Sequence, residues 1–255
     1  QYFLDRVRFN SKFSDFGAFE HDGKVYFASS RDEGVSVKRL YGWNEQPFLD
    51  VYVADVGTKR NVDHTAKLKG EVNSIYHDGP ITITKDGKTM YFSRNNIDDN
   101  GLSKDKKGIS NMKIYRATYI DSVWTNIEDL SINHTEYSTQ HPALNKDDSK
   151  LYFSSDWPGG LGGSDIYVVD INSDGTLGVP ENLGEVINTK NSEGFPFINN
   201  EGTLFFSSDG HPGLGLLDVF GTIQGENGEF VDVINLGIPI NSNKEKLIEF
   251  FPFDV

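Results

Sequence analysis

The sequence contains no cysteine among its 255 residues. Without thiols the chain can form neither disulfide bonds nor thiolate metal sites. Cysteine usage therefore does not indicate whether the protein works in an oxidising or a reducing compartment. No run approaches the roughly 18 consecutive apolar residues that a membrane-spanning helix needs. No stretch repeats apolar residues at helical spacing for long enough to predict a helix. These absences favour an all-β fold.

Positive charge is scarce as well. Against 38 Asp and Glu residues stand 24 Lys and Arg residues, which gives a formal net charge of −14. Binding to nucleic acid or to an anionic membrane surface requires clustered cations. We therefore expect no nucleic-acid partner, and membrane association only through other parts of the full protein.

Motifs of catalysis are missing too. The six histidines are scattered, and the sequence contains no His-Glu-x-x-His, Gly-x-Ser-x-Gly or phosphate-loop pattern in a suitable context. The Gly-rich segment 158–163 links two predicted strands, so it reads as a loop that needs positive φ angles. We expect that the protein is not an enzyme.

One structural unit occurs four times: a short apolar strand that ends near Ser, a loop, and a strand that opens with a charged residue and contains an aromatic ring. The equivalent phenylalanines, at positions 27, 92, 153 and 206, are 65, 61 and 53 residues apart. The second strands of the units are Asp50–Val53, Lys113–Tyr115, Asp165–Val168 and Asp218–Phe220. A unit of this size cannot bury its own apolar face and must stack on its neighbours, which indicates a repeat array.

Each unit is preceded by an Asn that suits a tight crossing between sheets, through hydrogen bonds to its own backbone. These are Asn10, Asn73, Asn133, Asn188 and Asn241. A short strand follows, with Pro expected at its start in the later copies, and then a hairpin turn such as Asp22-Gly23. A fourth strand is predicted at Val123-Trp124, Val179 and Phe230-Val231.

Four strands, a to d, make one blade of a β-propeller. We predict a single propeller domain over 1–255 with blade units at about 10–72, 73–132, 133–187 and 188–240 and a partial unit at 241–255. Five blades are expected, the last one incomplete in this chain, with six as the alternative. Residues near 18, 82, 143 and 197 should line the central axis.

The repeat resembles the WD40-like propeller repeat called PD40. The likeness rests on the Tyr-Phe-Ser-Ser-Asp strand, on the stretch Trp157–Tyr167 and on the unit ends Asn182-Leu183-Gly184 and Asn235-Leu236-Gly237. The opening Phe13–Gly17 makes the chain similar to the propeller of PorE-type outer-membrane lipoproteins of the type IX secretion and gliding machinery. Unit two departs from the pattern with Lys113 in place of Asp and Arg94-Asn95 in place of Ser-Asp.

The resemblance implies a non-catalytic interaction domain in a cell-envelope complex. Proteins of this type carry an OmpA-like, peptidoglycan-associated domain beside the propeller, at the periplasmic face of the outer membrane. The alternatives from other classes are a carbohydrate- or calcium-binding module, which Trp157 would favour, and the regulatory propeller of a larger peptidase.

A calcium loop is one candidate site. Asp170, Asn172, Asp174 and Glu181 have the spacing of oxygen ligands around a tight turn at Gly175. The segment lies between two strands with no flanking helices, so an ordinary hairpin is the competing interpretation. No other cofactor is expected.

A protein-binding surface is the other candidate. Units one and two carry insertions at Arg31–Leu49 and Arg94–Met112, both between strands b and c. Because successive strands reverse direction, b–c loops and d–a crossings emerge on one face, so the insertions should lie side by side. Large rings and lysines suit an interface centre and rim, and the expected contacts are Tyr41, Trp43, Phe48, Lys104 and Lys106.

Overall fold

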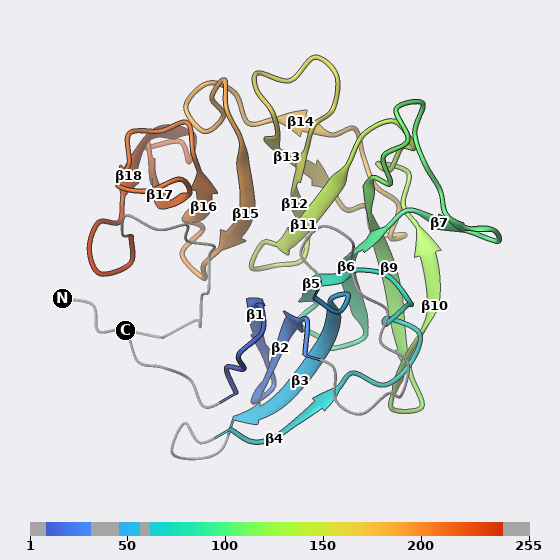
Figure 1. Cartoon of the computed structure of the whole chain (residues 1–255). Helices are drawn as coiled ribbons and strands as arrows, with labels where there is room; N and C mark the ends of the chain where they lie inside the picture. The colour runs from blue at the N-terminus through green and yellow to red at the C-terminus, as the bar shows by residue number, and fades with distance from the viewer. Residues whose placement is uncertain (1–8, 32–45, 57–61, 242–255) are drawn as a thin grey trace.

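The computed structural model describes residues 9–31, 46–56 and 62–241, which form four antiparallel four-stranded sheets around a central axis (Figure 1). Blade 1 consists of β1 (Asp15–His21), β2 (Lys24–Ser29), β3 (Asp50–Val56) and β4 (Val62–Lys67). Blade 2 consists of β5 (Asp78–Ile83), β6 (Thr89–Asn95), β9 (Met112–Ile120) and β10 (Val123–Asp129).

The other two blades follow in chain order. Blade 3 consists of β11 (Thr139–Leu144), β12 (Lys150–Ser155), β13 (Asp165–Asp170) and β14 (Glu181–Asn182). Blade 4 consists of β15 (Glu193–Ile198), β16 (Leu204–Ser208), β17 (Asp218–Gln224) and β18 (Phe230–Asn235). A small hairpin of β7 (Ile97–Asp98) and β8 (Gly101–Leu102) extends the b–c loop of blade 2.

The predicted all-β propeller of four-stranded blades is confirmed, with four blades described. The described residues contain no helix, and so none long and apolar enough to cross a membrane. All but the first residue of the partial unit 241–255 lie outside the described part, so the number of blades beyond four stays a prediction.

Tight hairpins join strands a and b as the sequence predicts. Asp22 and Gly23 have φ angles of 49° and 70°, and the flanking His21 and Lys24 are paired across the turn. Two consecutive left-handed residues form the turn whose twist matches that of the strands. The local sequence thus sets the pairing of β1 with β2.

The core lies between blades rather than inside them. In each blade the b-strand Phe stacks on an aromatic ring of strand c, as Phe153 does on Tyr167 with ring centroids 5.8 Å apart. Ile114 of blade 2 packs in the same cluster as Phe153 and Val169 of blade 3, and all three are buried. Each sheet therefore covers the apolar face of the next, as expected for a repeat array.

The crossing asparagines hold strand c of the blade just completed. Asn188 Oδ1 accepts the N–H of Ile166 at 2.7 Å, and Asn188 Nδ2 donates to the carbonyl of Ile166 at 3.0 Å. Three other asparagines make the same two bonds: Asn73 with Val51, Asn133 with Ile114 and Asn241 with Val219. The expectation that these asparagines bond their own backbone is wrong, because strand c offers a complementary N–H and C=O pair that faces the crossing.

The prolines of strand a lie within bulges, not at the strand start as expected. Pro142 and Pro196 are the fourth residues of their strands, and the pairing register shifts at each. A bulge leaves a residue outside the ladder, so the missing N–H of Pro costs no hydrogen bond there.

The fourth strand of blade 3 is β14 and not the segment at Val179, which is 84% exposed. The c–d turn is longer than predicted because Ile171 pairs with Leu177 and the Gly178 N–H donates to the Asp170 carbonyl. Strand d therefore begins two residues later, at Glu181.

Replacing Asn188 with Ala tests the crossing contact. Asn188→Ala leaves the N–H and C=O of Ile166 without their partners in a buried site, and we expect the free energy of unfolding to fall by about 3 kcal/mol. Urea denaturation measures the change. Lys190→Ala, at an exposed position of the same crossing, should change it by less than about 0.5 kcal/mol; equal effects would contradict the interpretation.

Candidate functional site

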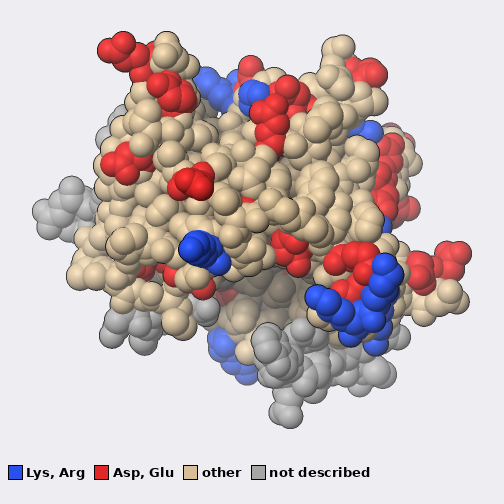
Figure 2. Space-filling view, turned by 90° about the horizontal axis from the view of Figure 1, so that it is seen from above, with Lys and Arg blue, Asp and Glu red and all other residues tan. Residues whose placement is uncertain are grey.

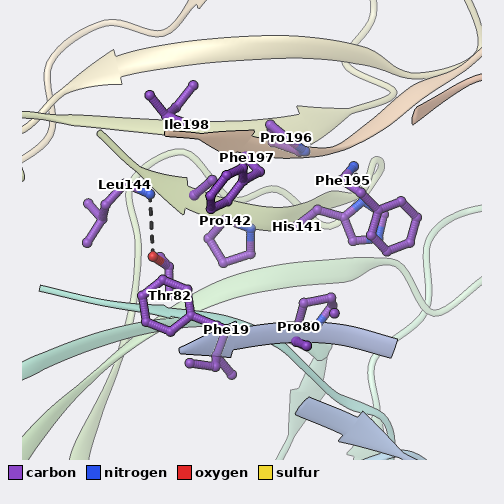
Figure 3. Close-up of a pocket in the computed structure, with 14 residues that line it drawn as sticks. Phe19, Pro80, Thr82, His141, Pro142, Leu144, Phe195, Pro196, Phe197 and Ile198 are labelled. Atoms are coloured by element: carbon purple, nitrogen blue, oxygen red, sulfur yellow. Dashed lines mark hydrogen bonds between the residues drawn. The ribbon is translucent and has the colours of Figure 1, made fainter. Parts of the chain in front are cut away.

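A pocket lies on the central axis, between the innermost strands of the four described blades (Figure 3). Its wall is built from equivalent positions of β1, β5, β11 and β15, which include Ala18, Thr82, Ala143 and Phe197. These are the positions predicted to line the axis. The prediction is confirmed, because all four residues lie on strand a of their blades and line this pocket.

The lining of this pocket has no charged side chain among the described residues, and three prolines and three phenylalanines form much of it. Its polar groups are the Thr82 hydroxyl, which accepts the Leu144 N–H at 3.4 Å, and the imidazole of His141. Burial lowers the pKa of His141 to about 3, so its ring is neutral at physiological pH. The pocket suits an uncharged ligand.

The face that carries the b–c loops is the second candidate site. Phe48 packs edge-on against Tyr76, with ring centroids 5.7 Å apart, and against His77 at 4.7 Å. Burial lowers the pKa of His77 to about 4, and His77 Nδ1 accepts the Leu49 N–H. Phe48 is therefore part of a small core that it forms with Tyr76 and His77. Tyr41 and Trp43 lie outside the described residues.

The loop of blade 2 lies next to this small core, since a Cβ built on Gly101 would be 3.0 Å from the Tyr76 hydroxyl. Lys104 and Lys106 are exposed on this loop, and Lys106 Nζ lies 3.8 Å from Glu136 Oε1. The structure thus brings Phe48 and the second loop to neighbouring places around Tyr76. On the face seen in Figure 2, acidic side chains are spread widely, and the largest group of basic side chains lies at one corner, with further basic side chains elsewhere.

The candidate calcium loop is a hairpin. Asp174 Oδ1 accepts the hydroxyl of Thr176 at 2.6 Å, Asp170 pairs with Lys150 at 2.5 Å, and Glu181 lies in β14. Among the described residues no three His, Cys, Asp or Glu side chains converge as metal ligands. The structure therefore does not bring Asp170, Asn172, Asp174 and Glu181 together around a cation.

This hairpin has a different contact. Arg116 of blade 2 donates to the Gly175 carbonyl at 2.6 Å while it also pairs with Glu128. The turn thus joins two neighbouring blades. Both a tight hairpin and a calcium loop need a sharp bend, which explains why the Asn-Ser-Asp-Gly sequence resembles a calcium loop.

The acidic residue that opens strand c caps its own b–c loop in blades 3 and 4. Asp165 accepts the N–H groups of Leu161 and Gly162 and the side-chain amide of Asn182. Asp218 likewise accepts the N–H groups of Leu214 and Gly215. Local capping uses both carboxylate oxygens of Asp165. In Asp218 it uses Oδ2 alone, and Oδ1 is buried without a hydrogen-bond partner among the described residues.

The partner on strand d changes with the residue on strand c. The pairs at this position are Asp50 with Lys67, Lys113 with Asp129, Asp165 with Asn182 and Asp218 with Asn235. In blade 2 the two charges have exchanged strands. The departure at Lys113 is therefore compensated inside its own blade.

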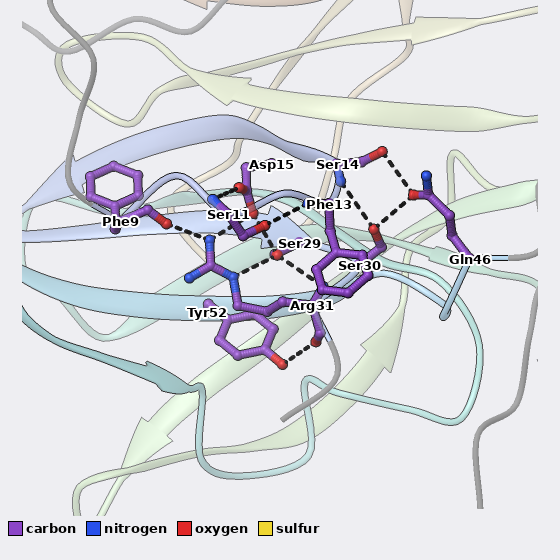
Figure 4. Close-up of polar contacts among 10 residues, drawn as sticks. All are labelled: Phe9, Ser11, Phe13, Ser14, Asp15, Ser29, Ser30, Arg31, Gln46 and Tyr52. Carbon is purple, nitrogen blue, oxygen red and sulfur yellow. Dashed lines mark hydrogen bonds and ion pairs between the residues drawn. The ribbon is translucent and has the colours of Figure 1, made fainter. Parts of the chain in front are cut away.

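A polar or aromatic side chain caps each Phe–aromatic stack, and this capping role was not predicted from the sequence. In blade 1 the Arg31 guanidinium lies 4.9 Å from the Phe27 ring centroid and donates to Asp15, Ser29 and the Phe9 carbonyl (Figure 4). Arg94, Trp157 and His211 take the corresponding places in the other blades.

Arg94 shows how closely such a cap is held. Its Nε donates to the buried Asp78 at 2.6 Å, and its Nη2 donates to the carbonyls of Glu71 and Val72. Burial raises the pKa of Asp78 to about 6, and the adjacent guanidinium opposes the rise. All these donors are used inside the blade, so the arginine is structural.

No protein-family model matches the chain, and no curated protein matches its sequence. Solved structures share its fold. A putative TolB from Agrobacterium tumefaciens has a TM-score of 0.52 at 16% identity, over 93% of this chain and 66% of that one. An α-L-arabinofuranosidase from Lactobacillus brevis has a TM-score of 0.52 at 14% identity, over 82% and 67%.

A puromycin-hydrolyzing peptidase from Mycobacterium tuberculosis matches at a TM-score of 0.49 and 14% identity, and this chain spans 32% of its length. At these identities the comparisons show the fold alone. The chain is a β-propeller whose structural neighbours include TolB-like proteins as well as enzymes.

Calcium is expected to leave the melting temperature unchanged at millimolar concentration, because the hairpin oxygens are bonded within the protein. Asp174→Ala removes the bonds to Thr176 and should lower the melting temperature slightly and equally with and without calcium. Calorimetry with calcium or with a chelator measures both. A rise with calcium that Asp174→Ala abolishes would restore the calcium site.

Exchange of Lys113 tests the compensated pair. Lys113→Asp places a carboxylate beside Asp129 and should lower the free energy of unfolding by about 1 kcal/mol. Adding Asp129→Asn recreates the pairing of Asp165 with Asn182 and should recover most of the loss. Urea denaturation of the single and the double variant measures the two free energies of unfolding. A double variant no more stable than the single one would contradict the pairing.

Proposed function

We propose that the chain is a non-catalytic, protein-binding β-propeller that acts as an interaction domain of a cell-envelope secretion or motility complex. The observation that carries this proposal is the ordered b–c loop of blade 2, residues 96–111, which extends outward from the propeller at β7 (Figure 1) and carries exposed side chains. Such a surface suits a partner protein.

Hydrogen bonds fix the shape of this loop. The Asn96 N–H donates to the Asn111 carbonyl at 2.8 Å, β7 pairs with β8, and Asp105 accepts the N–H groups of Lys107 and Ile109. A loop that is already ordered loses less conformational entropy when it binds. The exposed side chains that it presents are Lys104, Lys106, Lys107 and Ile109.

The central pocket supports a non-catalytic role. Glycoside hydrolysis uses a pair of carboxylates that flank the bond to be cleaved, and the described lining has no Asp or Glu. Trp157, on which a carbohydrate-binding role would rest, stacks against Tyr137 at 5.6 Å and lies 5.7 Å from Tyr167. Aromatic side chains thus already contact the indole, and no observation favours a sugar ligand there.

The PD40 resemblance supports a PorE-type role at the periplasmic face of the outer membrane. The contacts of Asn241 support the prediction of a fifth blade. Asn241 binds Val219 as the other crossing asparagines bind their strands. In the sequence, Phe251-Pro252-Phe253 matches Phe195-Pro196-Phe197 of strand a in blade 4, which favours a strand a of a fifth blade at this place.

Amine-reactive cross-linking of the envelope fraction tests the proposed function. We expect cross-links from Lys104, Lys106 or Lys107 to one envelope protein, because their exposed amines lie on the binding loop. The matched controls are Lys24, Lys85 and Lys88, which are exposed at the a–b hairpins on the opposite face. Lys104→Glu with Lys106→Glu should remove co-purification of that protein at an unchanged melting temperature.

Equal cross-linking from the two sets of lysines would contradict a specific docking face. Co-purification that survives both charge reversals would show that this loop is not the contact.

A further inference from the structure

Two bulky side chains stand at backbone positions of the central pocket that favour glycine. His141 and Phe195 have φ angles of 56° and 51°, and the equivalent residue of blade 1 is Gly17, at 65°. A left-handed conformation costs a residue other than glycine on the order of 1–3 kcal/mol when the structure enforces it. The two rings therefore occupy the channel against the backbone preference, which points to a role for the rings themselves.

The two rings form one aromatic wall. His141 and Phe195 are stacked with centroids 3.7 Å apart and planes 20° apart, and Phe16 of blade 1 meets Phe195 edge-on at 6.2 Å. Pro80, Pro142 and Pro196 line the same pocket (Figure 3). The wall is thus aromatic and rigid, and it joins blades 1, 3 and 4.

The hydrogen bonds of His141 determine which ring nitrogen carries the proton. Its Nδ1 accepts the Phe195 N–H at 3.3 Å and lies 2.9 Å from Ser154 Oγ. A nitrogen that accepts an N–H bond carries no hydrogen itself, so in the neutral ring the hydrogen is on Nε2. His141 therefore brings an N–H donor to the pocket lining.

We propose that the central pocket binds an uncharged, proline-containing peptide segment of the partner protein. Its apolar side chains would pack on Phe195, Phe197 and the pocket prolines, and one of its carbonyls would accept from His141 Nε2. This inference rests on the proposed protein-binding function and adds the chemistry of the bound segment.

Two properties of the pocket select this ligand. The described lining has no charged group, so burial of a charged side chain there would leave the charge without a partner, at a high cost. Extended proline-containing segments dock in aromatic-lined grooves because their backbone is already ordered before binding. The acidic surface of the protein, with a net charge of −14, further disfavours acidic peptides.

Titration of the full chain with the neutral peptide acetyl-Pro-Pro-Leu-Pro-Pro-amide tests the proposal. Saturable binding is expected by calorimetry, with shifts of the Thr82, His141 and Ala143 resonances in NMR spectra. Replacing the central Leu of the peptide with Glu should weaken binding at least tenfold. Equal binding of the two peptides, or no binding of the neutral one, would overturn the proposal.

Phe195→Gly is the decisive variant, because glycine suits the left-handed position, as Gly17 shows, and the fold should be retained. It should weaken peptide binding about tenfold or more through loss of the aromatic contact. The control is Val231→Ala, at an exposed position on β18, which should bind as the wild type does. Unchanged binding by a folded Phe195→Gly variant would overturn the role of the wall.

The two proposals fail in different ways. Cross-links from Lys104 or Lys106 without peptide binding would support the proposed interaction domain and contradict the proposed pocket ligand. Peptide binding with no preference among the exposed lysines would support the pocket and reject the loop face.

Discussion

No blade of this propeller can cover its own apolar face, and the remaining structure depends on this constraint. The b-strand phenylalanines are almost fully buried. Phe92, Phe153 and Phe206 each share a core cluster with residues of the preceding blade, and Phe27 packs against Phe9, which precedes blade 1. The crossings must therefore place successive sheets at one fixed spacing. The side chains that achieve this are the crossing asparagines, each of which binds a backbone N–H and C=O on the strand just completed.

Much of this architecture can be predicted from the sequence, because it follows from local rules. The repeat spacing, the Asp-Gly turns and the alternating apolar residues indicate four-stranded units, and the reversal of successive strands indicates which loops share a face. The position of the central lining at Ala18, Thr82, Ala143 and Phe197 follows from the same alignment.

Contacts between residues far apart in the sequence could not be predicted. Asn188 and Ile166 are 22 residues apart, and nothing in the crossing sequence indicates that strand c is the target. The caps on the aromatic stacks differ in residue type, as Arg31, Trp157 and His211 show, and their place in the sequence relative to the b-strand Phe also differs between blades. His141 and Phe195 have positive φ angles. The sequence does not indicate this conformation, because neither residue is a Gly and both simply precede a Pro.

The exchanged charges of blade 2 have a consequence for assembly. If β10 of blade 2 were to pair with β13 of blade 3, Asp129 would meet Asp165, and two carboxylates would repel each other where Asn182 now donates a hydrogen bond. If β4 of blade 1 were to pair with β9 of blade 2, Lys67 would meet Lys113. Similar units in one chain can trade outer strands during folding, and these charges make such mispaired sheets less stable than the correct one. The substitution at Lys113 that weakens the repeat pattern in the sequence thus helps blade 2 to pair with its own outer strand.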